Sequence, residues 1–303
     1  METSSLLKFW PLMHSVIQEF WTITEPQIEE AAVRANVPIE LYYYGELGLD
    51  HFSIKEFQGR DPFSNPEQFE RQFARLNVKD WIAPTIEDGR YKVAEKARAG
   101  VRRIVQAGDD CLSKFDKASK IDLDRLLSFL KLIVLANNSA PEPPQRVATA
   151  NRFRVATGNS PAVVQIRECL MDLFAYRDDS HLSAARPYFN QAGIVWIAFG
   201  SVCNGKTVTA EKIAEATPFR GYETSDYAAA LQAGVEVGWL EETEPKGAFK
   251  PTQIGKDMHD RVEKLTNEHF YRPWTTFSQT ELDELYGLLL KLREQLHGFR
   301  KTA

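Results

Sequence analysis

"TVTAEKIAEATPF", residues 207–219, begins the part of the chain that decides the fold. Thr209 suits the cap of a short helix, because its hydroxyl can accept a hydrogen bond from a backbone N–H of the first turn. A second helix-prone segment follows at 222–238, and "GWLEETEPKGAFKP" at 238–251 is typical of two short strands joined by a glycine-containing turn. These residues predict a helix-turn-helix followed by a β-hairpin.

The first half of the chain repeats this pattern. "FSIKEFQGRDPF" (52–63) aligns with "VTAEKIAEATPF" (208–219), so that Ser53 and Thr209 fall on the same cap position and both stretches close with Pro-Phe. "PIELYYYGEL" (38–47) similarly aligns with "GIVWIAFGSV" (193–202), and Trp81 with Trp239. Self-similarity of this kind indicates two copies of one structural unit.

A proline-rich stretch separates the two copies. "NNSAPEPPQ" (137–145) has the small polar and proline content of a linker. The segments "IDLDRLLSFLKLIV" (121–134) and "TELDELYGLLLKLREQL" (280–296) place leucines three and four residues apart, which predicts an amphipathic helix late in each copy. We therefore expect three regions: a first repeat at 1–138, a linker at 139–165 and a second repeat at 166–303.

The capped helix, the helix that follows it and the "GWL" strand before a turn resemble the winged helix-turn-helix modules of MarR-type regulators. The resemblance covers most of each half. It implies a mainly α fold (α+β winged helix), with tandem winged helix-turn-helix repeats that pair through their terminal helices as an intramolecular pseudo-dimer. It also implies a transcriptional regulator that binds double-stranded DNA and responds to an apolar small-molecule effector.

The first repeat carries the polar and basic residues that DNA binding needs. Four residues of the recognition segment at 64–79 have the spacing of one helix face: Gln68, Arg71, Gln72 and Arg75. Arginine and glutamine can make bidentate hydrogen bonds to guanine and adenine edges. Further cations suited to phosphates follow, namely Lys79, Arg90, Lys92, Lys96 and Arg98. A solvated helix face is the competing interpretation of the basic run at 90–103.

The second repeat differs in charge. Its recognition segment, 222–238, contains no lysine or arginine, and Glu223, Asp226 and Glu236 make it acidic. Phosphates would repel a helix of that charge. Either the protein reads DNA through the first repeat alone, or the second repeat binds a protein partner. The alternative function is therefore a protein-interaction module on a winged-helix scaffold that has lost DNA binding.

One motif points to a third function, nucleotide binding. "GSVCNGKT" (200–207) fits the phosphate-loop pattern G-x-x-x-x-G-K-[ST], in which backbone amides and a lysine hold phosphates. That loop requires a buried strand before it and a helix that starts at the lysine, whereas Thr209 is the better helix start here. An inter-helix loop explains the glycines, so we expect no nucleotide cofactor and no enzymatic activity.

Two other sets of residues have a structural and a functional interpretation. Asp178 and His181 in "YRDDSH" (176–181) have the chemistry of an acid–base pair or metal site, but ion pairing and capping at a helix end explain them, and we expect no metal. Aromatic residues are dense in both halves: Phe9, Trp10, Phe20, Trp21, Tyr42, Tyr43, Tyr44, Tyr188 and Trp196. Most are expected in the core, and the remainder are candidates for the apolar effector site.

The bulk composition limits the environment of the protein. The 303 residues have a formal net charge of −5, which argues against general coating of polyanions. The three cysteines, Cys111, Cys169 and Cys203, form no C-x-x-C pair, which is typical of a reducing compartment. The sequence shows no secretory leader and no long apolar run, so we expect a cytoplasmic protein without membrane contact.

Overall fold

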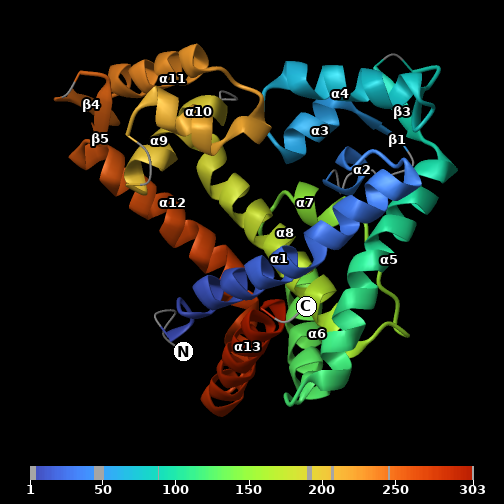
Figure 1. Cartoon of the computed structure of the whole chain (residues 1–303). Helices are drawn as coiled ribbons and strands as arrows, with labels where there is room; N and C mark the ends of the chain where they lie inside the picture. The colour runs from blue at the N-terminus through green and yellow to red at the C-terminus, as the bar shows by residue number, and fades with distance from the viewer. Residues whose placement is uncertain are drawn as a thin grey trace. The chain divides into compact units, whose positions relative to one another are not determined.

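The computed structural model describes residues 5–43, 51–87, 89–189, 193–205, 208–244 and 246–301. These residues are mainly helical with two small sheets, which confirms the expected mainly α class (Figure 1). The chain divides into two compact units. Unit 1 contains Met1–Asp50, Val93–Ser180 and Asn267–Ala303, and unit 2 contains His51–Lys92 and His181–Thr266. Within the described ranges, no helix has the length and apolar character needed to cross a membrane.

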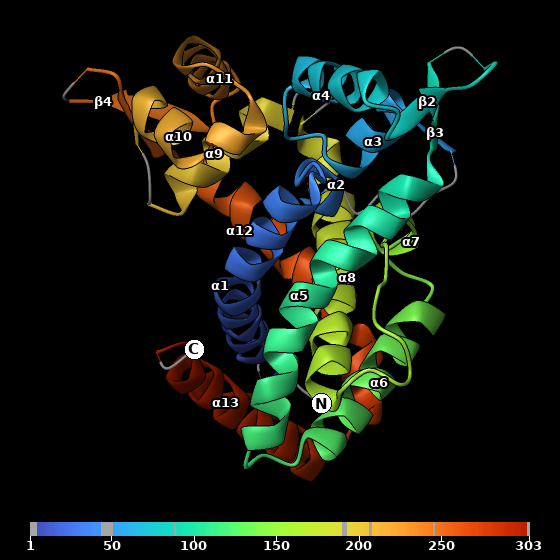
Figure 2. The same cartoon turned by 45° about the vertical axis from the view of Figure 1, so that its right-hand side comes forward.

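Unit 1 is a helical bundle built from both halves of the chain. Its helices are α1 (Phe9–Ala35), α2 (Glu40–Tyr43), α5 (Glu95–Ala118), α6 (Leu123–Ser139), α7 (Val147–Ala150), the first part of α8 (Ala162–Phe189), the end of α12 (Gln253–Tyr271), the 3-10 helix η4 (Arg272–Thr276) and α13 (Gln279–Arg300). Helix α1 packs against α5 and α13, and α6 packs against η4 and α13 (Figure 2). Helices from the start, the middle and the end of the sequence therefore share one core.

Leucine spacing explains how the two late helices enter this core. Leu126 and Leu130 of α6 are fully buried, and so are Leu285, Leu289 and Leu292 of α13. Both sets recur every three or four residues, so each helix turns one apolar stripe toward the bundle. The amphipathic helices predicted late in each half are confirmed.

The stretch predicted as a linker, 139–165, is tied to α8 within unit 1. The Asp179 carboxylate accepts a hydrogen bond from the backbone N–H of Ala148 at 2.7 Å, in the first turn of α7. A second link is made by Arg152, whose Nε donates to Asp172 at 2.6 Å. Because each of these bonds joins residues far apart in sequence, composition alone did not indicate them. The stretch is an ordered part of unit 1 rather than a free linker.

Glu142 connects the same stretch to the C-terminal part of unit 1. Its carboxylate accepts a hydrogen bond from Arg272 and lies 3.3 Å from Nδ1 of His269. The hydrogen bond from Arg272 is the largest influence on the Glu142 carboxyl and lowers its pKa. A carboxyl whose pKa is lower in the folded chain stabilises the fold above its unfolded pKa, about 4.3 for glutamate. That stabilisation is lost as the pH falls through the folded value.

We expect Glu142→Gln to flatten the acid limb of the stability profile. Below about pH 4.3 the free energy of unfolding should fall more steeply in the wild type than in the variant, since only the wild type must protonate this carboxylate. Urea denaturation at a series of pH values measures both slopes. Glu70→Gln makes the same chemical change at an exposed position of α4 (Pro66–Val78) in the other unit and is the control. Equal slopes for the wild type and Glu142→Gln would contradict this account.

Unit 2 contains two lobes. The first lobe, His51–Lys92, has β1 (His51–Ser53), α3 (Ile54–Arg60), α4, β2 (Ile82–Pro84) and β3 (Arg90–Val93). The second lobe, His181–Thr266, has the end of α8, α9 (Gly193–Cys203), α10 (Ala210–Ala216), the 3-10 helix η3 (Pro218–Arg220), α11 (Thr224–Glu236), β4 (Leu240–Thr243), β5 (Ala248–Pro251) and most of α12. Each lobe contains one small sheet.

The two sheets are antiparallel where their register is described. In the first lobe the strand order is β1-β3-β2, and Phe52 pairs with Tyr91. In the second lobe β4 pairs with β5, with Glu242 opposite Phe249. The backbone N–H of Phe249 also donates to the Val208 carbonyl at 2.9 Å, beside the second strand. Each lobe thus places a hairpin directly after its second short helix, as the sequence predicted.

The order of elements is the same in the two halves, but the compact units are not the linear repeats. Helix, helix and hairpin occur as α3-α4-β2-β3 and again as α10-α11-β4-β5, and a long helix follows each hairpin. Both units draw on 1–138 and on 166–303. The predicted boundary at 166 also falls inside α8, which begins at Ala162. Each predicted repeat therefore contributes to both units.

Candidate nucleic-acid interface

Local hydrogen bonds fix the starts of α3 and α4. Ser53 caps α3 as predicted, with its Oγ accepting from the Glu56 N–H at 3.1 Å while the Glu56 carboxylate accepts from the Ser53 N–H at 2.7 Å. Asn65 caps α4 by accepting from the Glu67 N–H at 3.0 Å. Pro66 occupies the first helical position, where a missing N–H costs nothing. The starts of both helices are therefore set by the sequence.

One face of α4 is anchored by an aromatic cluster. Phe69 and Phe73 are buried, and the Phe73 ring lies 5.1 Å from Phe52, 5.2 Å from Phe57 and 5.9 Å from Tyr91. These rings come from α4, α3 and the strands β1 and β3, so the cluster joins every element of the first lobe except β2. The opposite face of α4 is consequently held toward solvent.

The exposed face of α4 carries some of the predicted base-reading residues. Arg71 and Arg75 are exposed, and Lys79 is exposed just beyond the helix. Arg71 pairs with Glu67 one turn earlier at 3.3 Å, whereas Arg75 has no ion pair among the described residues. Gln72 is half-buried. Arg75 is therefore the arginine of α4 that is best placed to meet a ligand.

Gln68 lies on the predicted face of α4 but is bonded within the protein. Its Nε2 donates a hydrogen bond to the Phe219 carbonyl in the second lobe at 2.7 Å. A side chain that is bonded in this way is not presented to DNA together with Arg71 and Arg75. Helical spacing placed Gln68 on the same face correctly, but it did not indicate that another segment covers one end of that face.

The cations predicted to hold phosphates fall in both units. Arg90, on β3, lies 3.4 Å from both Glu56 and Glu87, and its side chain is 33% exposed. Lys92, on the same strand, is exposed and has no ion pair among the described residues. Lys96 is exposed and Arg98 is half-buried at the start of α5, and both belong to unit 1. Within the first lobe, Lys92 is therefore the hairpin cation available to a ligand.

The second lobe repeats the construction with the opposite charge. Thr209 caps α10 as predicted, with its Oγ1 accepting from the Lys212 N–H at 3.4 Å. At the start of α11 the Asp226 carboxylate accepts from the Glu223 N–H at 2.8 Å. On the hairpin, Lys250 pairs with Glu241 at 3.1 Å. The exposed surface of α11 therefore offers acidic rather than basic groups.

The nucleotide-binding interpretation gains no support from the region of its motif. Gly200 lies inside α9, so a helix rather than a buried strand comes before the glycine-lysine pair. Gly205 has a positive φ of 64°, which suits a tight turn, while Lys206 and Thr207 lie outside the described residues. The surroundings are those of a loop between two helices.

Of the two predicted metal or acid–base candidates, His181 makes a structural contact, because it accepts a hydrogen bond from Trp196 Nε1 at 3.2 Å. Asp178 is half-buried on α8, and it is its neighbour Asp179 that bonds to backbone groups of α7, as described above. The structure brings no group of three or more His, Cys, Asp or Glu side chains together for a metal ion in the part of the chain that it describes. The hydrogen bond from Trp196 gives His181 a structural role.

Most of the aromatic candidates for an effector site are packing residues. Phe9 and Phe20 are buried in the core of unit 1, and Trp196 is buried in that of unit 2. Trp10 and Trp21 both pack against Phe174, at 5.8 Å and 5.7 Å between ring centres. Tyr44 lies outside the described residues. An apolar effector stays a prediction of the family resemblance.

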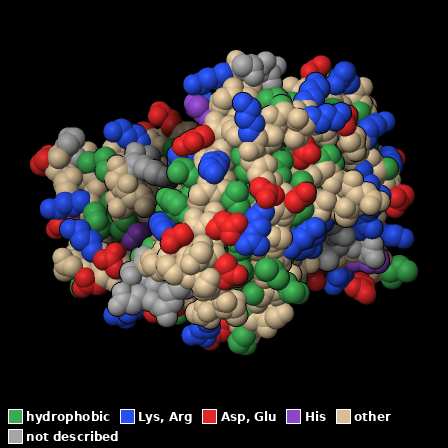
Figure 3. All heavy atoms as spheres, turned by 90° about the horizontal axis from the view of Figure 1, so that it is seen from below, with side chains coloured by type: hydrophobic (Ala, Val, Ile, Leu, Met, Phe, Trp, Pro, Cys, Tyr) green, Lys and Arg blue, Asp and Glu red, His purple; other side chains and the backbone are tan. Residues whose placement is uncertain are grey.

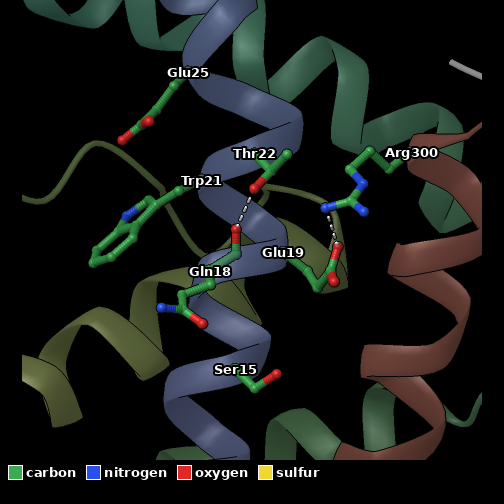
Figure 4. A pocket seen from close by; sticks show the side chains of 7 residues that line it. All are labelled: Ser15, Gln18, Glu19, Trp21, Thr22, Glu25 and Arg300. Carbon is green, nitrogen blue, oxygen red and sulfur yellow. Dashed lines mark hydrogen bonds and ion pairs between the residues drawn. The ribbon is translucent and has the colours of Figure 1, made fainter. Parts of the chain in front are cut away.

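A pocket of about 420 Å³ lies on α1 beside the end of α13 (Figure 4). Figure 4 shows Arg300 of α13 reaching toward Glu19 of α1, and the two side chains are 3.4 Å apart. Most of the lining is polar: Ser15, Gln18, Glu19, Trp21, Thr22, Glu25 and Arg300. Since Trp21 is the lone large apolar side chain in this lining, the pocket does not match the apolar effector site that the resemblance implies.

On the face shown in Figure 3, lysine and arginine side chains lie among aspartates and glutamates rather than in one patch. Comparison of the chain with protein-family models, curated proteins and solved structures found no match in any of the three. The candidate interface therefore rests on the chain's own residues, the exposed Arg71, Arg75 and Lys92 of the first lobe.

Proposed function

We propose that this protein is a DNA-binding transcriptional regulator of the MarR-like type, formed by tandem winged helix-turn-helix repeats. The order helix, helix, hairpin in each lobe of unit 2 supports the repeats. The pairing of the repeats as an intramolecular pseudo-dimer is supported by the core of unit 1, where α1 and α6 of the first half pack with α8 and α13 of the second.

The observation that carries the proposal is the division of α4 into two faces. Phe69 and Phe73 fix the inner face, so that Arg71 and Arg75 project from the outer one. A helix that follows a helix-turn and carries outward arginines suits the major groove, where arginine pairs with guanine. The acidic α11 would be repelled by phosphates, so DNA is engaged from the first lobe.

Two substitutions separate base reading from phosphate contact. After selection of preferred duplexes from a random pool, Arg75→Ala should reduce the preference at one base pair by about 1–3 kcal/mol, since a bidentate contact to a base edge is lost. Lys92→Ala should weaken binding to all duplexes alike. It should also lower the slope of log affinity against log salt concentration by about one. Fluorescence anisotropy across a salt series measures both effects.

Lys250→Ala is the matched control for these variants. It removes one positive charge from the hairpin of the second lobe, where Lys250 already pairs with Glu241. Its affinity for DNA should equal that of the wild type. The three variants Arg75→Ala, Lys92→Ala and Lys250→Ala could instead weaken DNA binding equally on every sequence. General attraction between charges would then be the only explanation of the binding. Absence of binding to any selected duplex at low salt would end the proposal.

A protein-interaction module is the second candidate, and the acidic start of α11 favours it. Glu223 and Asp226 form a capping pair at an exposed helix end, where a basic partner segment would be attracted. Replacing both residues with lysine should abolish capture of such a partner while leaving DNA affinity unchanged or increased. A pull-down in which the variant keeps its partner would count against this candidate.

A further inference from the structure

The two lobes of unit 2 meet through the turns that carry the repeated Pro-Phe pairs. The turn between α3 and α4 faces the turn between α10 and α11. The backbone N–H of Asn65 donates to the Arg220 carbonyl at 2.8 Å, and Asn65 Nδ2 donates to the Gly221 carbonyl at 3.0 Å. The hydrogen bond from Gln68 to Phe219 lies beside them. We call this set of contacts the clasp.

Ionic and apolar contacts extend the clasp. Arg220 Nη1 lies 3.4 Å from Asp61 Oδ1, and its guanidinium lies 5.7 Å from the centre of the Phe63 ring. Phe63 packs against the hydrophobic cluster of the second lobe. A Cβ at Gly193 would lie 1.9 Å from the Pro62 carbonyl oxygen, so glycine is needed where the two backbones approach. The lobes are therefore in close contact at this point.

The clasp engages Gln68 at the end of α4 that a helix-turn-helix protein needs for base reading. In such proteins the N-terminal residues of the recognition helix contact the base edges. Here the amide of Gln68 is bonded to Phe219, and a Cβ at Gly221 would lie 1.9 Å from Gln68 Oε1. The turn at 219–221 thus occupies the space beside this first helical turn, and the acidic Glu223 follows two residues later.

We propose that the clasp is an autoinhibitory contact. While it is closed, the second lobe holds Gln68 and places the turn at 219–221 beside the first turn of α4, and DNA gains full contact with this helix only after the clasp opens. The inference rests on the proposed DNA-binding function. It predicts that the binding-competent state is a minor one in the free protein, so any change that opens the clasp raises the apparent affinity for DNA.

Arg220→Glu tests this prediction against simple electrostatics. The introduced carboxylate would face Asp61 and repel it, which opens the clasp, and the change also makes the protein more negative by two charges. If the clasp is inhibitory, the affinity for a selected duplex should rise about tenfold, because the competent state is no longer the minor one. If charge attraction alone governed DNA binding, the more negative Arg220→Glu variant would bind the duplex more weakly than the wild type. Combining Arg220→Glu with Asp61→Arg restores an ion pair at the wild-type net charge and should return the affinity toward the wild-type value.

A distance measurement shows whether the clasp proposal or the proposed DNA-binding function is wrong. Spin labels at Val78→Cys and Val237→Cys, exposed positions near the ends of α4 and α11, report the separation of the lobes in a background whose three native cysteines are replaced. The label distance should lengthen in Arg220→Glu and when the wild-type background binds a selected duplex. The labelled background must bind DNA as the wild type does.

Each outcome decides one proposal. The clasp is supported if Arg220→Glu binds DNA more tightly and the added Asp61→Arg change reverses that gain. It also requires a longer distance between the spin labels when DNA binds. Tight DNA binding with an unchanged label distance overturns the clasp and leaves the proposed function standing. Weaker binding by Arg220→Glu that the swap does not reverse also overturns the clasp. A longer distance in Arg220→Glu without binding of any duplex overturns the proposed function, and the inhibitory role falls with it.

Discussion

Replacing Asp109 with alanine is expected to lower the free energy of unfolding by about 3 kcal/mol, because it leaves a buried arginine without its main partner. Asp109 of α5 lies 2.6 Å from Arg167 of α8, and the two side chains are only 10% and 9% exposed. Burial raises the pKa of the Asp109 carboxyl, although Arg167 lies beside it. In the variant Glu168 remains 3.1 Å from Arg167 as a second carboxylate partner. The expected loss of unfolding free energy is therefore at the low end of the range for a broken buried ion pair.

Two further variants show whether burial sets the size of this effect. Arg154→Ala removes a pair with Asp172 in which the arginine is 42% exposed, and it should cost less than about 1 kcal/mol. Asp109→Leu combined with Arg167→Met replaces both charges by apolar groups and should recover most of the loss. Urea denaturation gives all three values. Equal losses for Asp109→Ala and Arg154→Ala would contradict the role of burial.

Local features of this fold could be predicted from the sequence because their causes are local. Ser53 and Thr209 were identified as caps since a hydroxyl before a helical pattern satisfies the N–H groups of the next turn. The hairpin after Trp239 follows from the strand residues on either side of the turn at Gly247, which has a φ of 89°. The leucine-rich helices were predicted because apolar spacing along a helix depends only on neighbouring positions.

Contacts between distant segments could not be predicted in this way. Periodicity placed Gln68 on the outer face of α4, but its partner is the Phe219 carbonyl, 151 positions away in the sequence. Proline content suggested that 139–165 is a linker, yet Arg152 and Asp179 bind it to α8 through side chains. Each of these contacts depends on how helices pack, which a single sequence does not specify. For the same reason, the sequence did not predict that each compact unit combines segments from both halves of the chain.

The exposure of the candidate residues was predicted in part. Arg71, Arg75 and Lys92 are exposed in the first lobe, as a ligand-binding surface requires. Arg90 is engaged by two glutamates, and Lys96 and Arg98 belong to the other unit. Residue type therefore indicated which side chains are able to bind phosphate, but only the structure distinguishes those that already have protein partners.

Phe73→Ala should be the second large effect, with a loss of about 3–5 kcal/mol in the stability of the first lobe. Phe73 is 0% exposed and is the ring that Phe52, Phe57 and Tyr91 all contact. Its removal leaves a cavity at the point where α3, α4 and the strands meet. Hydrogen exchange resolved by peptide should show faster exchange in His51–Lys92, with unit 1 remaining protected. Arg75→Ala, on the opposite face of the same helix, should change stability by less than about 0.5 kcal/mol.

The same variant tests whether DNA binding requires the folded lobe or only its cations. Phe73→Ala keeps Arg71, Arg75 and Lys92, so its net charge equals that of the wild type. If a folded α4 must present these cations, the affinity should fall in proportion to the fraction of molecules in which the lobe is folded. Arg75→Ala should instead keep the fold and lose only base preference. Full affinity in a Phe73→Ala protein whose first lobe exchanges freely would mean that the cations act without the fold, and base reading by α4 would then be excluded.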